Sequence, residues 1–159
     1  MIEVVHADLK RPEHAAALVM LLEAYARDPA GGGEGLAEAV KARLPCALAD
    51  RPGTHVLLAF VEDRPAGIAI AFDGFSTFAC APLLNLHDFA VHPEFRGRGL
   101  GKALLGELEK LGRELGCCKL TLEVLANNTP ARSLYRASGF ADYALDDAFG
   151  NALFMQRWL

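Results

Sequence analysis

Residues 84–105, which read LNLHDFAVHPEFRGRGLGKALL, decide the fold of this chain. The first part, Leu84–Val91, is rich in apolar and β-forming side chains and predicts a strand. From Leu100 to Leu115, leucines recur at spacings of three and four residues, which predicts a helix with one apolar face. A strand that passes through a glycine-rich turn into a helix, with a second strand after it, indicates a β-α-β unit.

Three glycines and three basic side chains share the turn between that strand and that helix. Without Cβ atoms the chain can direct several backbone N–H groups to one point, and the start of the helix adds its partial positive charge. Cations in the same turn strengthen the attraction for a polyanion. The turn therefore predicts a phosphate or pyrophosphate site, and a plain glycine turn with solvated arginines is the alternative interpretation. The glycines are Gly97, Gly99 and Gly101, and the cations are Arg96, Arg98 and Lys102.

Two other phosphate-binding loops do not fit the same letters. The G-x-x-x-x-G-K-[ST] loop needs a glycine where Arg96 stands and a metal-binding hydroxyl where Ala103 stands. The dinucleotide pattern G-x-G-x-x-G has Lys102 or Leu104 in its last glycine place, depending on the register. Neither fingerprint is intact, and the turn offers no magnesium ligand.

Hydrophobic periodicity predicts further elements on both sides of this unit. Before it, we expect a strand, two helices and an antiparallel hairpin; after its helix, we expect a short strand, another helix and a final strand. The earlier elements are Ile2–His6, Pro12–Arg27, Leu36–Leu44, His55–Val61 and Gly67–Phe75, and the later ones are Leu120–Val124, Pro130–Ser138 and Ala152–Trp158.

The composition is that of a globular protein. The chain has 159 residues, of which 52% are hydrophobic and 23% charged, and this length fits a single domain over residues 1–159. A formal charge of −4 gives no overall basic field, so we expect no nucleic-acid partner. The longest apolar run, Ala15–Leu22, is too short to span a membrane, and the N-terminus does not read as a secretory signal. We therefore expect a cytoplasmic protein with no membrane partner.

The four cysteines, Cys46, Cys80, Cys117 and Cys118, have no C-x-x-C spacing. An adjacent pair such as Cys117–Cys118 is not a usual zinc or redox pattern. We therefore expect mostly buried, reduced thiols and no bound metal.

Two signatures in this chain resemble those of the GNAT acetyltransferase superfamily. The pyrophosphate loop of that family reads R/Q-x-x-G-x-G/A, and its second signature has an asparagine seven residues before a tyrosine, followed by glycine and phenylalanine. Together with the hairpin and the strand order, the resemblance covers most of the chain, and its specific letters lie within about Leu84–Phe140. The first signature is filled by Arg96, Gly99 and Gly101, and the second by Asn128, Tyr135, Gly139 and Phe140.

The resemblance implies an α/β fold of the α+β kind, with a mixed, mostly antiparallel twisted sheet flanked by helices and a splayed pair of strands that holds the cofactor. It implies direct acetyl transfer from acetyl-coenzyme A (acetyl-CoA) to an amine in a ternary complex, without an acyl-enzyme. A weaker similarity of residues 72–88 to the diamine acetyltransferase branch favours a small primary amine, either a polyamine or an amino-acid side chain. Members of the superfamily often form homodimers, so a homodimer is expected here too. The alternatives are an inactive CoA-binding regulatory domain, a nucleotide-binding module and acetylation of a protein amine.

The functional positions of the family transfer onto this sequence residue by residue. Tyr135 corresponds to the tyrosine whose hydroxyl protonates the departing thiolate, and a tyrosine packed in the core is the alternative. The backbone N–H of Phe89 corresponds to the donor for the thioester oxygen. The implied cofactor-binding residues are Phe89, Ala90, Val91, Arg96, Gly97, Arg98, Gly99, Leu100, Gly101, Lys102, Asn128, Arg132 and Tyr135.

The general base has no fixed position in the family. His87 occupies the place where polyamine-type members carry the glutamate of an E-D pair, and an imidazole titrates near neutral pH. Either His87 is the base or it fills a polar gap in the strand. By simple alternation, Asp88 should face the opposite side of the strand.

Overall fold

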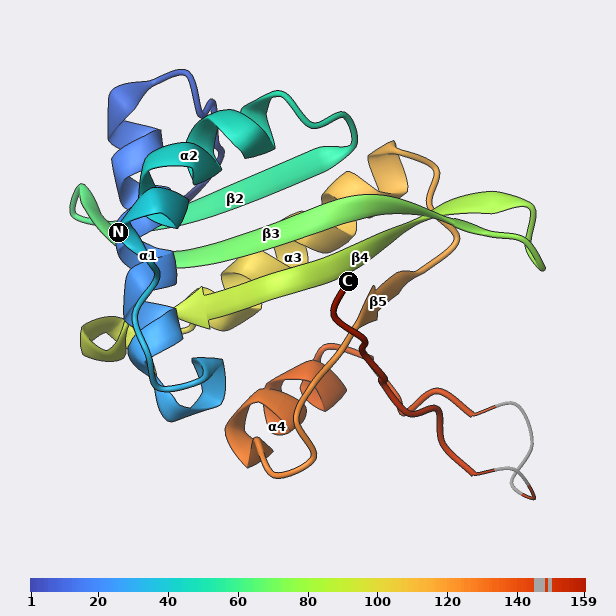
Figure 1. Ribbon diagram of the computed structural model, residues 1–159. Coiled ribbons are helices and arrows are strands. Elements are labelled where there is room, and N and C mark those ends of the chain that lie inside the picture. The colour runs from blue at the N-terminus through green and yellow to red at the C-terminus, as the bar shows by residue number, and fades with distance from the viewer. Residues whose placement is uncertain (145–147, 149) are drawn as a thin grey trace. The chain divides into compact units, whose positions relative to one another are not determined.

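A computed structural model describes residues 1–144, 148 and 150–159, and the chain forms two compact units, Met1–Leu122 and Glu123–Leu159 (Figure 1). The first unit holds a sheet with helices on both of its faces, and the second holds helix α4. None of the described helices combines the length and the apolar composition that a membrane crossing requires.

The first unit is built on a mixed, mostly antiparallel sheet, which confirms the predicted fold class. The strands lie in the order β1-β2-β3-β4-β5, so neighbours in sequence are neighbours in the sheet. Only β4 and β5 run parallel, and the helix α3 that connects them completes the predicted β-α-β unit. The strands are β1 (Ile2–His6), β2 (Thr54–Val61), β3 (Arg64–Ser76), β4 (Ala81–Val91) and β5 (Leu120–Leu122).

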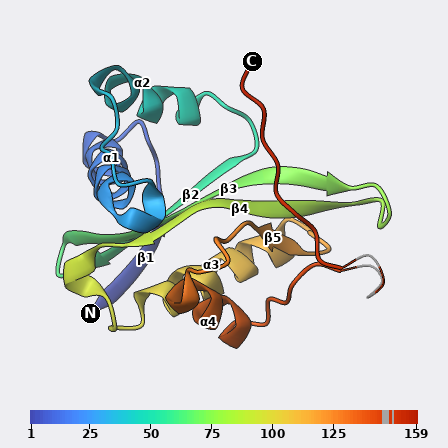
Figure 2. The same cartoon turned by 60° about the horizontal axis from the view of Figure 1, so that its bottom comes forward.

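Helices α1 and α2 cover one face of this sheet, the α1/α2 face, and α3 covers the other, the α3 face (Figure 2). Leu58 and Ile70 pack with the leucines of α1 because every second side chain of a strand points to the same face. On the α3 face, Leu104 is fully buried, and a Cβ added at Gly67 would lie 3.0 Å from its Cδ1, so α3 packs directly on the β3 backbone. The helices are α1 (Pro12–Arg27), α2 (Glu38–Ala49) and α3 (Leu100–Glu114), and single 3-10 turns form η1 (Pro29–Gly31) and η2 (Pro93–Phe95).

Helix α2 departs from its predicted range, Leu36–Leu44. It begins two residues later and continues through Pro45 to Ala49. A proline inside a helix removes one backbone hydrogen bond and usually ends the helix. Here Leu48, one turn beyond, is buried in the same core cluster as the α1 leucines, and this packing compensates for the lost bond.

The cysteines are free thiols, as predicted, but the expected burial is wrong for three of them. Cys46, Cys80 and Cys118 are exposed, whereas Cys117 is half-buried. Burial raises the pKa of the Cys117 thiol, which makes it less reactive.

Strand β4 extends beyond its parallel neighbour. The last residue pair between the two strands is Leu86–Leu122, and β5 ends there although the sequence predicts a strand as far as Val124. Strand β4 runs on to Val91, paired with β3 on its other side. The two strands are therefore joined at one end and not at the other, as the resemblance implies for the cofactor-holding pair.

The second unit contains α4 (Thr129–Ala137), which is close to the predicted Pro130–Ser138. The predicted final strand over Ala152–Trp158 is wrong. Among the described residues near it, the backbone pairing is limited to one bridge, Ala144–Asn151, and one hydrogen bond from the Ala152 N–H to the Tyr143 carbonyl. A strand needs a continuous ladder, and a run of apolar side chains does not supply one.

Candidate active site

The glycine-rich turn presents backbone N–H groups at the start of α3. Gly97 and Gly99 have φ values of 75° and 86°, a left-handed conformation that glycine adopts without strain. Helix α3 begins at Leu100, so Gly101 lies in the helix and not in the turn. The cap residue of α3 makes no side-chain hydrogen bond, and the first turn of the helix has no acidic residue. The first N–H groups of a helix lack helical acceptors and attract anions.

An aromatic ring holds the basic side chain in the middle of this turn. Phe95 is buried, and the guanidinium carbon of Arg98 lies 5.4 Å from its ring centroid. Within the described residues, neither Arg98 nor Lys102 has a carboxylate at ion-pair distance. Two cations at the start of α3 thus keep their charge for an external anion.

Arg96 differs because its side chain has partners inside the protein. Its Nη2 lies 2.7 Å from Oδ2 of Asp28, and its Nε donates to the Val91 carbonyl at 3.2 Å. The hydrogen bond from Arg96 holds the pKa of the Asp28 carboxyl below its ordinary value. Arg96 therefore ties the turn to the connection after α1, and its contact with a pyrophosphate stays a prediction.

An irregularity in β4 brings two ionisable side chains to the same face of the sheet. Asp88 pairs with Ile70 of β3, but the next pair along the ladder is Leu86–Ala71. His87 is therefore an extra residue in β4, a β-bulge. Because cross-strand partners share a face, Asp88 lies with Ile70 on the α1/α2 face.

The ring of His87 lies on that face as well. Its centroid is 5.4 Å from the centroid of Phe72, which packs against the α1/α2 core. The expectation that Asp88 would face the opposite side from His87 is therefore wrong, because the bulge interrupts the alternation of side chains.

Asp88 is half-buried between His87 and helix α1. Burial raises the pKa of its carboxyl, and the positive charge of protonated His87 partly opposes this rise. The pKa of the Tyr25 hydroxyl is raised by burial and then by the negative charges of Asp88 and Asp28. The charges of the bulge carboxyl and of the residue that holds Arg96 thus both act on Tyr25.

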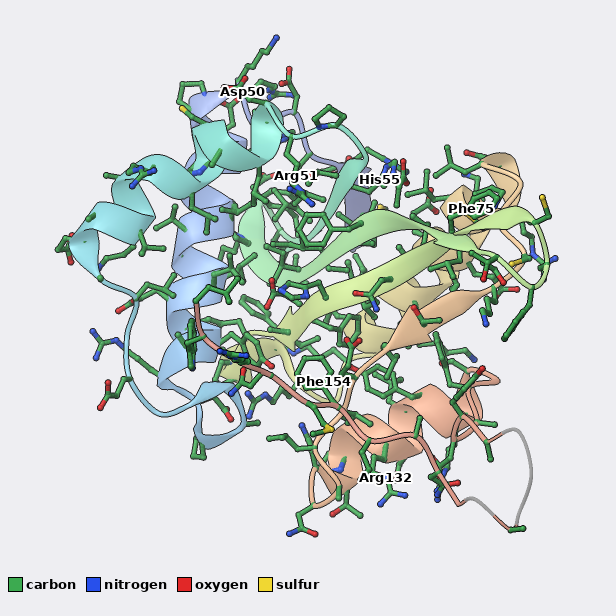
Figure 3. The ribbon with its side chains drawn as sticks, turned by 45° about the vertical axis from the view of Figure 1, so that its right-hand side comes forward. Asp50, Arg51, His55, Phe75, Arg132 and Phe154 are labelled. Carbon is green, nitrogen blue, oxygen red and sulfur yellow. The ribbon has the colours of Figure 1, made fainter. Side chains whose placement is uncertain are left out.

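Two more side chains adjoin the bulge on the α1/α2 face. Arg51, labelled in Figure 3, follows α2. Its guanidinium carbon lies 5.3 Å from the centroid of the Phe72 ring, which also contacts His87. Asn85, which pairs with Phe72, donates from Nδ2 to Oγ1 of Thr121 at 3.1 Å. This face therefore carries an imidazole and a guanidinium at one aromatic ring, and a half-buried carboxyl on the residue after the imidazole.

The strand residues predicted to bind the cofactor follow the bulge directly. Phe89 pairs with Ala69 and Val91 with Gly67, so both side chains point to the α3 face, whereas Ala90 packs on the α1/α2 face. All three lie beyond the last residue pair that β4 makes with β5.

The second signature is a helix with both of its ends capped. Oδ1 of Asn128 accepts a hydrogen bond from the Ala131 N–H at 3.3 Å, so Asn128 is the N-cap of α4. At the other end, Gly139 is left-handed, and the N–H of Phe140 donates to the carbonyl of Tyr135 at 3.0 Å. This is a Schellman motif, and the rings of Phe140 and Tyr135 supply its apolar contact at 5.9 Å.

The caps fix the helix that carries two of the predicted site residues. Tyr135 is buried. Arg132, labelled on α4 in Figure 3, donates from Nη1 to the Ala126 carbonyl at 2.9 Å. The spacing of the residues in this signature thus corresponds to the two caps of α4.

The structure brings together, within the first unit, the glycine turn, the end of β4 and the bulge. Asn128, Arg132 and Tyr135 belong to the second unit. Sequence reasoning missed Arg51 and Tyr25, which have no motif of their own. It also placed Asp88 on the wrong face of the sheet. Two adjacent ionisable residues within a strand, His87 and Asp88, were the available signal that the alternation of side chains is interrupted there.

Comparison with known proteins agrees with these features. A sequence model of the Acetyltransferase (GNAT) family matches residues 18–140. Thialysine N-epsilon-acetyltransferase of Caenorhabditis elegans is 28% identical over 124 residues, which are 78% of this chain and 75% of that protein. Streptothricin acetyltransferase of Streptomyces lavendulae is 37% identical over 89 residues, which are 56% of this chain and 47% of that protein.

Among solved structures, a ribosomal-protein-alanine N-acetyltransferase from Brucella melitensis biovar Abortus 2308 matches with a TM-score of 0.79 at 20% identity, over 99% of this chain and 100% of that chain. At this identity the likeness shows the fold. The family match covers more than half of the chain and includes residues of both units. The chain belongs to the GNAT family of acetyltransferases, and it is an N-acetyltransferase.

Proposed function

We propose that this enzyme transfers the acetyl group of acetyl-CoA to a primary amine of a small molecule, either a polyamine or an amino-acid side chain. The observation that carries the proposal is the bulge, which sets His87 and Asp88 side by side on the α1/α2 face, next to the part of β4 beyond β5. The relative named for an ε-amine of thialysine supports a small amine acceptor.

The residues of the first unit fit acetyl-CoA. The turn and the first N–H groups of α3, with Arg98 and Lys102, would hold the pyrophosphate, and the backbone of Phe89–Val91 would pair with the pantetheine arm. Lys102 and Arg98 support this assignment because, among the described residues, neither has a carboxylate at ion-pair distance. Bound acetyl-CoA supplies an acetyl thioester, in which the carbonyl carbon is activated for attack.

Three groups of the protein then have separate roles in the proposed reaction. His87 takes the proton that the acceptor ammonium must lose, the backbone N–H of Phe89 stabilises the thioester oxygen as it gains charge, and the hydroxyl of Tyr135 protonates the departing sulfur. One C–N bond forms and one C–S bond breaks. The acceptor ammonium loses two protons in all: the first passes through His87 to solvent, and the second is balanced by the proton that Tyr135 gives to the sulfur of CoA. No residue of the protein is acetylated.

A thiol-release assay with acetyl-CoA and a panel of amines tests this proposal. We expect release of CoA that depends on a small primary amine and equals the acetylated amine formed, as measured by mass spectrometry. If CoA were released at the same rate with and without each amine, the proposal would be contradicted. If a protein-derived peptide were the best acceptor, the proposed small-molecule acceptor would be wrong.

His87→Ala should reduce turnover by about two to four powers of ten near neutral pH, the usual contribution of a general base. Part of the activity should return at alkaline pH, where more of the acceptor is already neutral. The measurement is a pH–rate profile with one acceptor. His55→Gln is the matched control, because His55 is also a strand histidine beside a carboxylate, 2.7 Å from Asp73, but lies on the α3 face. Equal profiles for both variants would exclude His87 as the base.

Asp88→Asn should make the protein more stable and less active. Burial raises the pKa of the Asp88 carboxyl in the folded state, so its ionised form opposes folding. The parent should therefore lose stability as the pH rises above about 4, the ordinary pKa of an aspartate in an unfolded chain. The variant should therefore melt at a higher temperature than the parent at pH 7, and the difference should vanish below about pH 4. Turnover should fall by about tenfold, since a neighbouring charge changes an ionisation equilibrium by about one pKa unit or more.

Thermal melts across pH measure the first effect. Glu114→Gln removes an exposed carboxylate of α3 and should show neither change. An Asp88→Asn protein that is less stable than the parent at pH 7 would mean that the carboxylate supports the fold.

Tyr135→Phe should lower turnover far more than it weakens acetyl-CoA binding, because the ring keeps its contact with Phe140 while the proton donor is lost. Loss of a general acid costs about two to four powers of ten, or roughly 3–5 kcal/mol in the barrier, and a thiolate leaves readily enough to place this variant at the low end. Single-turnover rates and calorimetric binding separate the two effects. A variant that runs at the parent rate across the pH range would exclude Tyr135 as the acid.

A further inference from the structure

We infer that Arg51 binds a carboxylate of the acceptor, so that the preferred acceptor is an amino acid with a side-chain amine and not a plain diamine. This inference rests on the proposed function, because it adds a second contact to the same acceptor whose amine His87 deprotonates.

Arg51 is held in place without using its charge. Its guanidinium carbon lies 5.3 Å from the Phe72 ring centroid, and no described carboxylate lies at ion-pair distance from it. Many other arginines have such a partner, among them Arg27 with Glu23 and Arg96 with Asp28. Among the described residues, Arg51 thus resembles Arg98, which also contacts an aromatic ring and lacks a carboxylate at ion-pair distance, and Arg98 lies in the predicted anion-binding turn.

A guanidinium above an aromatic ring is well suited to a carboxylate. Contact with the ring restricts the side chain, and the planar fork of N–H donors matches the two oxygens of a carboxylate. Such bidentate, charge-assisted pairs are among the stronger polar contacts in proteins.

The position of Arg51 fits the length of an amino acid. The Phe72 ring lies 5.3 Å from the Arg51 guanidinium and 5.4 Å from the His87 ring, so these two groups are separated by no more than the sum of the two distances. In extended lysine the carboxylate carbon and the side-chain nitrogen are six bonds apart, or roughly 7 Å. Such a molecule can reach from Arg51 to His87 along one face.

The charges on this face also select for such an acceptor. Its side-chain ammonium would lie near the carboxyl of Asp88 and its carboxylate near Arg51, where the carboxylate also offsets the charge of the α-ammonium. A diamine of the same length would place an ammonium against the guanidinium with no carboxylate to offset it. Specificity often depends on a repulsive contact of this kind as well as on an attractive one.

The test compares acceptors that differ only by the carboxylate: L-lysine with cadaverine, and L-ornithine with putrescine. The parent should prefer the amino acid of each pair. Arg51→Gln should lower kcat/KM for the amino acids by about tenfold to a hundredfold, and this loss should come from a higher KM. The kcat/KM for the diamines should stay the same or rise. For Arg51→Lys, kcat/KM for the amino acids should lie between the parent and Arg51→Gln values, because lysine keeps the positive charge but lacks the paired N–H donors of the guanidinium. Arg43→Gln, which removes an exposed charge of α2, is the matched control.

Calorimetry of the same acceptors in the presence of desulfo-CoA gives a second readout that does not need turnover. Arg51→Gln should lose affinity for lysine and not for cadaverine, with circular dichroism confirming that the variant is folded. Equal use of both acceptors by the parent, or an equal loss for both in the variant, would overturn the inference. If the parent acetylates no amine, the proposed function fails, and calorimetry still decides whether Arg51 binds a carboxylate.

Discussion

The extra residue in β4 is the constraint on which the rest of the site depends. Leu86 and Phe89 both face α3, yet they are three residues apart, and strict alternation would place them on opposite faces. The bulge at His87 resolves this conflict. It keeps the apolar side chains of both halves of β4 under α3, and it leaves His87 and Asp88 together on the α1/α2 face. One inserted residue thus serves packing on one face and sets the proposed base beside a carboxyl on the other.

Local sequence signals predicted most of the fold, because most elements have them. The bounds of β1 and α1 agree with the expected ranges, and the leucine spacing placed α3 to within one residue. The signal failed where distant packing decides the outcome. Helix α2 passes through Pro45 because Leu48 is buried, and Ala152–Trp158 forms no described ladder despite its apolar side chains. The exposure of three cysteines had no local signal either.

The candidate site was predictable where a motif exists and not where side chains meet by folding. The turn around Gly99 was identified from its letters, and its left-handed glycines explain them. The residues of the second signature likewise cap a helix, with Asn128 at its N-terminal end and Gly139 at its C-terminal end. The partner of Arg96, however, is Asp28, which is 68 residues away in the sequence, and Arg51 meets His87 only through the ring of Phe72. Pairings of this kind depend on strand register, and a single bulge was enough to invert the expected direction of Asp88.

In the proposed reaction the amine attacks the thioester directly while both substrates are bound to the enzyme. Initial velocities, measured while acetyl-CoA and the best amine acceptor are varied together, distinguish this route from one through an acetylated enzyme. Direct transfer predicts double-reciprocal lines that intersect, because both substrates must be bound before the acetyl group moves. Parallel lines, the sign of an acetylated enzyme intermediate, would contradict it.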